Sequence, residues 1–154
     1  MKKLSTDADY NLWMLLVQTR NATLKARKKE LTAYHISPRQ SAILFFTQAT
    51  EGKVTATEIA RWLILEPHTI SELLKRMEKD GLITKVKGSS KKRSVKIALT
   101  EKGRQAYHQS LKRESIRDIL SCLSEAEQEQ LRSSLKKIRD KALEFTLARE
   151  FPFS

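Results

Sequence analysis

The stretch from Thr55 to Gly81 constrains the fold more than any other part of the chain, because it encodes two short helices separated by a tight break. Thr55 followed three residues later by Glu58 is a capping box, a pattern that begins a helix. Pro67 suits the first position of a second helix, where its missing N–H would have no helical partner. Since isoleucine tolerates positive φ poorly, we expect the break at Ile64–Glu66 to avoid that backbone conformation.

The second helix, expected over residues 67–80 and ended by Gly81, has one apolar and one polar face. Its apolar residues recur at i, i+3, i+4 and i+7, the spacing of a buried face, and are Ile70, Leu73, Leu74 and Met77. The opposite face carries His68, Thr69, Ser71, Glu72, Lys75 and Arg76. Two helices, a short turn and a polar outer face match the helix-turn-helix motif, whose second helix lies in a DNA major groove.

Two segments of alternating side chains follow and predict a β-hairpin over residues 82–99. From Lys85 to Lys96 the sequence contains basic but no acidic residues. A cationic hairpin tip beside a recognition helix is typical of a wing, which reaches the phosphate backbone or the minor groove. At this tip we expect DNA contacts from Ser90, Lys91, Lys92 and Arg93.

In the order and spacing of these segments, the chain resembles the MarR-type winged helix-turn-helix regulators over roughly residues 36–104. The most specific matches are the passage Leu73 to Ile83, Arg93 in the wing, and the run Leu99–Gly103 that opens the next helix. The family's wing commonly has Asp-x-Arg, whereas Lys91 stands where the Asp would be, which predicts a looser and less specific wing.

The resemblance implies a mostly α fold with a small β-hairpin, in which a winged helix-turn-helix core is flanked by N- and C-terminal dimerisation helices. We expect a single domain over residues 1–154. Its DNA-binding lobe is expected at 36–100, with the recognition helix at 67–80 and the wing at 82–99. The dimerisation helices are expected mainly at 7–34 and 101–150.

Capping patterns locate the flanking helices. They predict helices from Ser37 to about Glu51, from Thr100 to about Leu120, and onward from Ser124, and a stripe of apolar residues predicts a first helix from Asp7 to about Tyr34. In the helix that Ser37 begins, Ala42, Ile43, Phe45 and Phe46 are expected in the core, and Val54 is expected to add a short strand. The last helix carries an apolar stripe of Leu131, Leu135, Ile138, Ala142 and Phe145. A winged helix of this size cannot cover that much apolar surface, so we expect a homodimer.

A formal net charge of +12 at pH 7 indicates a polyanion or a membrane surface as partner. No apolar run is long enough to span a bilayer, no signal-peptide pattern begins the chain, and the single cysteine excludes an internal disulfide. We therefore expect double-stranded DNA as partner, no membrane, and a cytoplasmic location. The chain shows no nucleophile–base pair, phosphate-cradling glycine loop, cofactor motif or metal-ligand spacing, so no enzyme, cofactor or metal is predicted.

Several of these residues have a structural alternative. The polar face of the second helix could be an ordinary exposed surface; Glu66 is better explained as a helix cap than as a base reader. Arg76 could bind phosphate, which we favour, or pair with Glu72. Cys122 is expected to be buried and inert, because nothing cationic adjoins it in sequence.

A small-molecule effector is a further partner that the resemblance implies, in a site between the helices that flank the DNA-binding core. Aromatic and histidine side chains could line it, although core or dimer packing explains most of them equally well. They are Trp13, Tyr34, His35, Phe45 and Tyr107. His35 and His108 could meet in the fold, but metal sensing is not favoured, because no histidine pair has ligand spacing.

Three functions remain open. The favoured one is a dimeric, sequence-specific transcription regulator, a repressor relieved by a small ligand, that binds a pseudo-palindromic operator. The alternative is a sequence-tolerant architectural DNA-binding protein, which the high charge and the altered wing would suit. A protein-interaction module or an enzyme is the least favoured.

Overall fold

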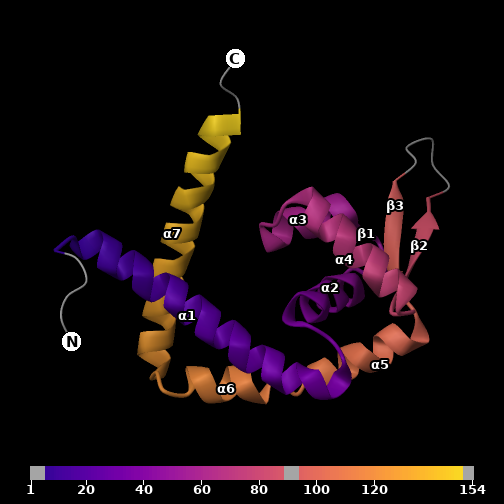
Figure 1. Ribbon diagram of the computed structural model, residues 1–154, viewed down its shortest axis with the longest axis horizontal. Coiled ribbons are helices and arrows are strands. Elements are labelled where there is room, and N and C mark those ends of the chain that lie inside the picture. The colour runs from indigo at the N-terminus through magenta and orange to yellow at the C-terminus, as the bar shows by residue number, and fades with distance from the viewer. Residues whose placement is uncertain (1–5, 89–93, 151–154) are drawn as a thin grey trace. The chain divides into compact units, whose positions relative to one another are not determined.

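The computed structural model describes residues 6–88 and 94–150, whose elements are labelled in Figure 1. The helices are α1 (Ala8–Leu31), α2 (Pro38–Ala49), α3 (Ala56–Leu63), α4 (Pro67–Lys79), α5 (Glu101–Ser110), α6 (Glu114–Leu120) and α7 (Glu125–Glu150), with a 3₁₀ turn η1 (Thr32–Tyr34). The strands are β1 (Val54–Thr55), β2 (Ile83–Lys87) and β3 (Val95–Leu99). The chain divides into a first unit, Met1–Ser115, and a second unit, Ile116–Ser154.

The strands form one antiparallel sheet in the order β1–β3–β2. The hairpin pairs Ile83 with Leu99 and Lys87 with Val95, which confirms the predicted hairpin strands. Val54 pairs with Ile97 at the other edge of β3, so the short strand predicted at Val54 is also confirmed. Figure 1 shows α3 and α4 beside this sheet, as a winged helix-turn-helix requires.

Side-chain caps begin the helices where the sequence predicts them. The Ser37 hydroxyl accepts the Gln40 amide of α2 at 3.1 Å, and the Gln40 side chain accepts the Ser37 amide at 2.8 Å. Thr55 and Glu58 make the same reciprocal pair at α3. Ser124 and Glu127 repeat it at α7. Each box satisfies amides that the first helical turn leaves without a backbone partner.

The turn of the helix-turn-helix corrects the prediction about Ile64. Ile64 adopts a left-handed conformation with φ +53°, contrary to the expected avoidance of positive φ. The conformation lets the Leu65 amide reach back to the Ala60 carbonyl at 3.0 Å, the closing hydrogen bond of a Schellman motif. The Ile64 side chain is 52% exposed, so its branched Cβ meets solvent rather than a packed wall.

The core of the first unit gathers beneath α4. Ile70, Leu74 and Met77 are buried as predicted, and Leu73 packs against the same cluster. The cluster also contains Ile43, Leu44, Ile59, Val54, Ile83 and Ile97. Phe45 was expected in the core but is 41% exposed, because the buried face of α2 runs through Ile43, Leu44 and Thr47.

The predicted helix from Thr100 to about Leu120 is interrupted, and that prediction is wrong. Thr100 caps α5 through the Gly103 amide at 3.0 Å, but α5 ends at Ser110 and α6 begins at Glu114. Arg113 between them has φ +50°. The Glu114 amide donates to the Glu30 carboxylate of α1 at 2.7 Å instead of to a helical carbonyl. This partner lies far away in sequence, so local capping signals do not show the break.

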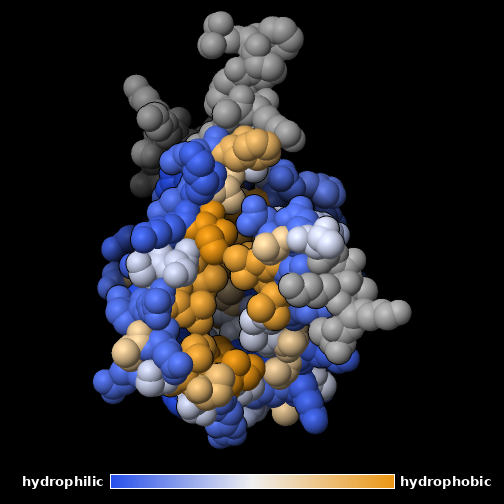
Figure 2. All heavy atoms as spheres, turned by 90° about the vertical axis from the view of Figure 1, so that its left-hand side faces the viewer, coloured by the Kyte–Doolittle hydropathy of each residue, from blue (hydrophilic) through white to orange (hydrophobic). Residues whose placement is uncertain are grey.

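Both terminal helices expose apolar side chains. On α1, which the Asp7 side chain caps, Tyr10, Leu12, Trp13 and Leu15 are each more than half exposed. In the second unit the α7 stripe of Leu131, Leu135, Ile138 and Phe145 is 39–61% exposed. Orange hydrophobic residues are accordingly visible at the surface in Figure 2. Among the described helices none combines the length and apolar content needed to cross a membrane.

Candidate nucleic-acid interface

Helix α4, the predicted recognition helix, starts at Pro67, which occupies its first turn as the sequence predicts. Glu66 lies at the N-cap with an extended backbone, but in the described structure its side chain makes no capping hydrogen bond. The first amides of α4 therefore have no side-chain acceptor at their N-terminus. Uncapped amides at the positive end of a helix bind a phosphate oxygen favourably. The start of α4 is therefore suited to contact the DNA backbone.

The polar face of α4 is open to solvent. His68, Ser71, Lys75 and Arg76 are exposed, whereas Thr69 and Glu72 are half-buried. All six sequence-predicted residues of this helix thus lie on one accessible side of α4, opposite the buried Ile70, Leu74 and Met77. This geometry lets several of these side chains approach base edges or phosphates together.

An ion pair on the polar face of α4 occupies two of its charged side chains. Lys75 Nζ lies 3.0 Å from Glu72 Oε1, and this hydrogen bond lowers the pKa of the Glu72 carboxyl. Glu72 therefore pairs with Lys75 and not with Arg76, the pairing weighed in the sequence. Among the described residues, no side-chain hydrogen bond or ion pair engages the Arg76 guanidinium, which acts on Glu72 only through longer-range attraction. Its guanidinium is therefore available for a phosphate, and the predicted phosphate contact stays a prediction.

Strand β2 of the hairpin lies beside α4. Lys85 Nζ on β2 is 3.9 Å from Glu78 Oε1 on α4. A mostly apolar cavity of about 200 Å³ separates the helix from the hairpin; it is lined by Ala56, Ser71, Leu74, Lys85, Val95 and Ile97. Ser71 and Lys85 therefore flank one depression on the side where α4 presents its polar face. The predicted contacts Ser90, Lys91, Lys92 and Arg93 lie outside the described residues.

Lys85 and Lys87 are candidate contacts that the sequence-derived residue set omits. Both belong to β2 and both are exposed. The signal was available, because both fall within the basic run from Lys85 to Lys96. Their distance from the hairpin tip is the reason that a set centred on the tip leaves them out.

The proposed effector residues do not form one cluster. Tyr34 and His35 line a groove of about 500 Å³ together with Lys102, Gln105 and Gln109 of α5. Trp13 is 59% exposed on α1 and does not reach this groove. Phe45 instead contacts the Arg113 guanidinium, 5.7 Å from its ring centre, and Tyr107 lies beside the His108 ring. The structure therefore brings together only Tyr34 and His35 of the predicted five.

Known proteins of similar sequence and structure share this winged-helix arrangement. A family model described as a winged helix DNA-binding domain matches residues 36–103. The organohalide-sensing transcriptional regulator RdhR, in its structure with 2,4-dichlorophenol bound, is 30% identical; the match covers 92% of this chain and 85% of RdhR, with a TM-score of 0.84. The chain belongs to the MarR-type family of winged helix-turn-helix transcriptional regulators.

Two further relatives of this MarR-type regulator are informative. The organic hydroperoxide resistance transcriptional regulator of Bacillus subtilis is 33% identical over 93 residues, 60% of this chain and 62% of that protein. The chain thus spans less than two thirds of that relative's length. An E. coli MarR mutant in complex with operator DNA is 19% identical and has a TM-score of 0.77 over 83% of this chain and 93% of that chain, which shows a shared fold.

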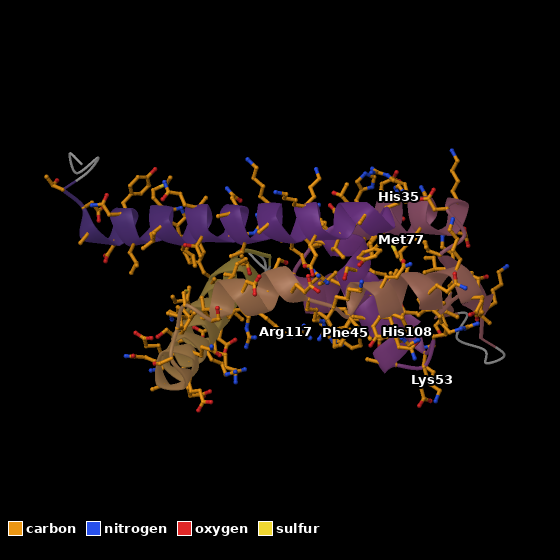
Figure 3. The ribbon with its side chains drawn as sticks, turned by 90° about the horizontal axis from the view of Figure 1, so that it is seen from below. His35, Phe45, Lys53, Met77, His108 and Arg117 are labelled. Carbon is orange, nitrogen blue, oxygen red and sulfur yellow. The ribbon has the colours of Figure 1, made fainter. Side chains whose placement is uncertain are left out.

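Cys122, His35 and His108 are the other side chains that could sense a redox change or a metal. Cys122 was expected to be buried, but its side chain is exposed in the turn between α6 and α7, whose neighbouring Leu120 is itself exposed. His35 and His108 lie apart in Figure 3. Within residues 6–88 and 94–150, no three histidine, cysteine, aspartate or glutamate side chains gather as a metal site.

Proposed function

We propose that this MarR-type chain is a dimeric, cytoplasmic, sequence-specific repressor that binds a pseudo-palindromic operator and is released by a small ligand. The observation that carries the proposal is the exposed polar face of α4, supported from below by Ile70, Leu74 and Met77 and flanked by the basic β2 strand. A rigid buried face and an open polar face are what a recognition helix needs to enter a major groove.

Charge supports DNA as the partner. The net charge of +12 provides long-range attraction to a polyanion, and the basic run at the wing concentrates part of it beside α4. Arg76 and Lys85 supply cations for phosphates, whereas Thr69, Ser71 and Glu72 carry hydrogen-bonding groups for base edges. Phosphate contacts supply affinity, and the α4 side chains supply the discrimination between sequences.

The dimer is supported by the apolar surface that the terminal helices expose. Leu131, Leu135 and Ile138 recur along one side of α7, and Trp13 and Leu15 are exposed on α1. Burial of such side chains against a second copy is favourable by roughly 25 cal/mol for each Å² removed from water. A two-fold dimer places its two recognition helices about one DNA turn, roughly 34 Å, apart, which leads to a pseudo-palindromic site.

The ligand is supported by relatives and by one groove. RdhR, the relative at 30% identity, is described as organohalide-sensing and has been solved with a chlorinated phenol. In this chain we propose that the groove beside Tyr34 and His35 receives a small ligand of aromatic character. To release DNA, the ligand must bind the DNA-incompetent arrangement of the dimer more tightly than the competent one.

Selection of random duplex DNA by the purified protein, at near-physiological salt, tests this function. The proposal predicts enrichment of an inverted repeat and a preference over unrelated DNA of roughly 10³-fold or more. Binding without enrichment would instead support a sequence-tolerant architectural protein. That alternative is favoured by Lys91, which replaces the Asp commonly found in the family's wing.

A further inference from the structure

A partly buried ion pair on α1 connects three helices of the first unit. Arg27 of α1 is only 8% exposed. Its Nη1 donates to Glu30 Oε2 at 2.6 Å, and its Nη2 donates to the Ser110 carbonyl at the end of α5 at 2.8 Å. A longer contact of 3.5 Å joins Nη2 to the Ser41 hydroxyl of α2. The guanidinium therefore connects α1, α2 and the last residue of α5.

The Glu30 carboxylate continues this connection to the start of α6. Its Oε1 accepts the Glu114 backbone N–H at 2.7 Å. Its Oε2 accepts both Arg27 and the Ser115 hydroxyl. Burial pushes the pKa of this carboxyl upward, but the hydrogen bonds from Ser115, Arg27 and Glu114 together lower it below its ordinary value. The group is therefore an anion at neutral pH, with both oxygens engaged.

These contacts surround the segment where the first unit ends. The first unit ends at Ser115, the residue whose hydroxyl donates to Glu30. Two residues earlier, Arg113 adopts φ +50°, a conformation that side-chain-bearing residues rarely take. Its guanidinium lies over the Phe45 ring of α2. Contacts from α1 and α2 thus select one backbone path among those open to an isolated linker.

We infer that Arg27 and Glu30 are positioning residues for operator binding, because they fix the backbone path between the end of α5 and the start of α6 and so the half-site spacing that the dimer accepts. The inference rests on the proposed function, in which helices of the second unit contribute to the dimer. In such a dimer, a change of the backbone path at residues 111–115 would alter how each copy presents its recognition helix. The distance and angle between the two recognition helices then change together.

Binding to operators of different spacing tests this role. The full-length protein is titrated against the selected inverted repeat and against versions with one or two base pairs added to or removed from the centre. Two base pairs turn one half-site by about a fifth of a helical turn. Wild-type protein is expected to lose about tenfold or more in affinity on the altered spacers. Glu30→Gln, which removes the charge and one acceptor oxygen, is expected to reduce that loss to about threefold or less, fold-changes within the usual range of coupling between sites.

Two further variants separate positioning from simple destabilisation. Ser115→Ala removes the hydroxyl contact at the joint but leaves the Arg27–Glu30 pair intact, and is expected to weaken spacing discrimination with little change in melting temperature. Glu101→Gln is the matched control, because Glu101 also pairs with an arginine three residues on, at 2.9 Å, but on the exposed surface of α5. It is expected to keep the wild-type discrimination.

The affinities of these variants for operators of different spacing decide whether Arg27 and Glu30 have a positioning role. A loss of affinity by the same factor on every spacer in Glu30→Gln, or wild-type discrimination in both Glu30→Gln and Ser115→Ala, would overturn the positioning role. An absence of any spacing preference in the wild-type protein would instead contradict the dimeric operator binding on which the inference rests. Selective loss of discrimination in the two variants, with the control unchanged, supports the inference.

Discussion

Helices α4 and α7 carry similar apolar stripes but differ in what covers them. In α4, Ile70, Leu74 and Met77 are at most 1% exposed beneath the sheet and neighbouring helices. In α7, Leu131, Leu135 and Ile138 follow a comparable helical spacing but are 39–47% exposed. The spacing therefore reports which side of a helix is apolar, whereas burial depends on whether the same chain supplies a covering surface. For α7 we propose that a second copy supplies it.

The largest expected effect tests the covered stripe. Leu74→Ala should reduce the free energy of unfolding by about 2–5 kcal/mol, because it leaves a cavity in a fully packed site. Urea unfolding at low protein concentration measures the change. Leu135→Ala on α7 is the matched control and should cost much less under these conditions. Equal losses in the two variants would contradict the contrast between the helices.

The uncovered stripe should respond instead through association. Leu135→Asp should raise the dimer dissociation constant by about 30-fold or more, because a charge would enter the apolar centre of the interface, a change worth at least about 2 kcal/mol. Sedimentation equilibrium measures this constant. Ser133→Asp adds the same charge on the opposite side of α7 and should leave association nearly unchanged; a similar effect at both positions would argue against a specific interface.

DNA binding by the proposed contact surface of the first unit should be sensitive to single cations. Arg93→Ala in the wing should weaken operator binding by about 1–3 kcal/mol, and Arg76→Ala should reduce the salt dependence by about one counterion contact. Fluorescence titrations at several salt concentrations measure both. Lys136→Ala is the control, because it removes a positive charge from α7 that is not among the proposed DNA contacts. Unchanged affinity in Arg93→Ala would remove the wing from the mechanism.

The dependence of folding stability on pH should also differ between the first and the second unit. The hydrogen bonds around Glu30 lower its pKa from 4.5, so its contribution to stability is complete above about 4.5 and is lost as pH falls through the lower, folded-state pKa. The pairs of the second unit, such as Arg132–Glu129, are exposed and should contribute little to this change. Thermal unfolding of Glu30→Gln between pH 3 and 6, roughly spanning this transition, should show a flatter pH dependence than wild type. Parallel curves would contradict this assignment.

The smallest expected effect concerns the turn before α4. Ile64→Gly should stabilise the first unit by up to about 1 kcal/mol, because glycine adopts positive φ without the cost that a Cβ imposes. The greater freedom of glycine in the unfolded chain limits the gain. Chemical unfolding compares this variant with Thr57→Gly, an exposed position in the first turn of α3, which should destabilise. A clear loss of stability in Ile64→Gly would mean that the Ile64 side chain contributes more packing than its exposure indicates.

Local signals predict much of the fold, because capping and apolar spacing act within one or two helical turns. Ser37, Thr55, Thr100 and Ser124 all begin helices as predicted, and the hairpin follows from its alternation. The same signals place the polar residues of α4 on one accessible side. These elements need no knowledge of distant parts of the chain.

The features that sequence reasoning missed depend on distant contacts or on backbone closure. The break at Arg113 requires Glu30, a partner far away in the sequence. Positive φ at Ile64 follows from the hydrogen bond between Leu65 and Ala60, which propensity alone did not indicate. Phe45 is exposed because Leu44 takes the buried position, and an apolar run of Ile43 to Phe46 does not show which members face inward.

The central claim, that α7 associates with a second copy while α4 faces DNA, is tested most directly by the mass of the protein–operator complex. Sedimentation of the wild-type chain with the selected duplex, and of Leu135→Asp with the same duplex, gives the number of chains bound. The account predicts two chains on each inverted repeat for wild type, and separate, weaker binding of single chains for the variant. One chain on each wild-type duplex, or the same cooperative pair in Leu135→Asp, would contradict it.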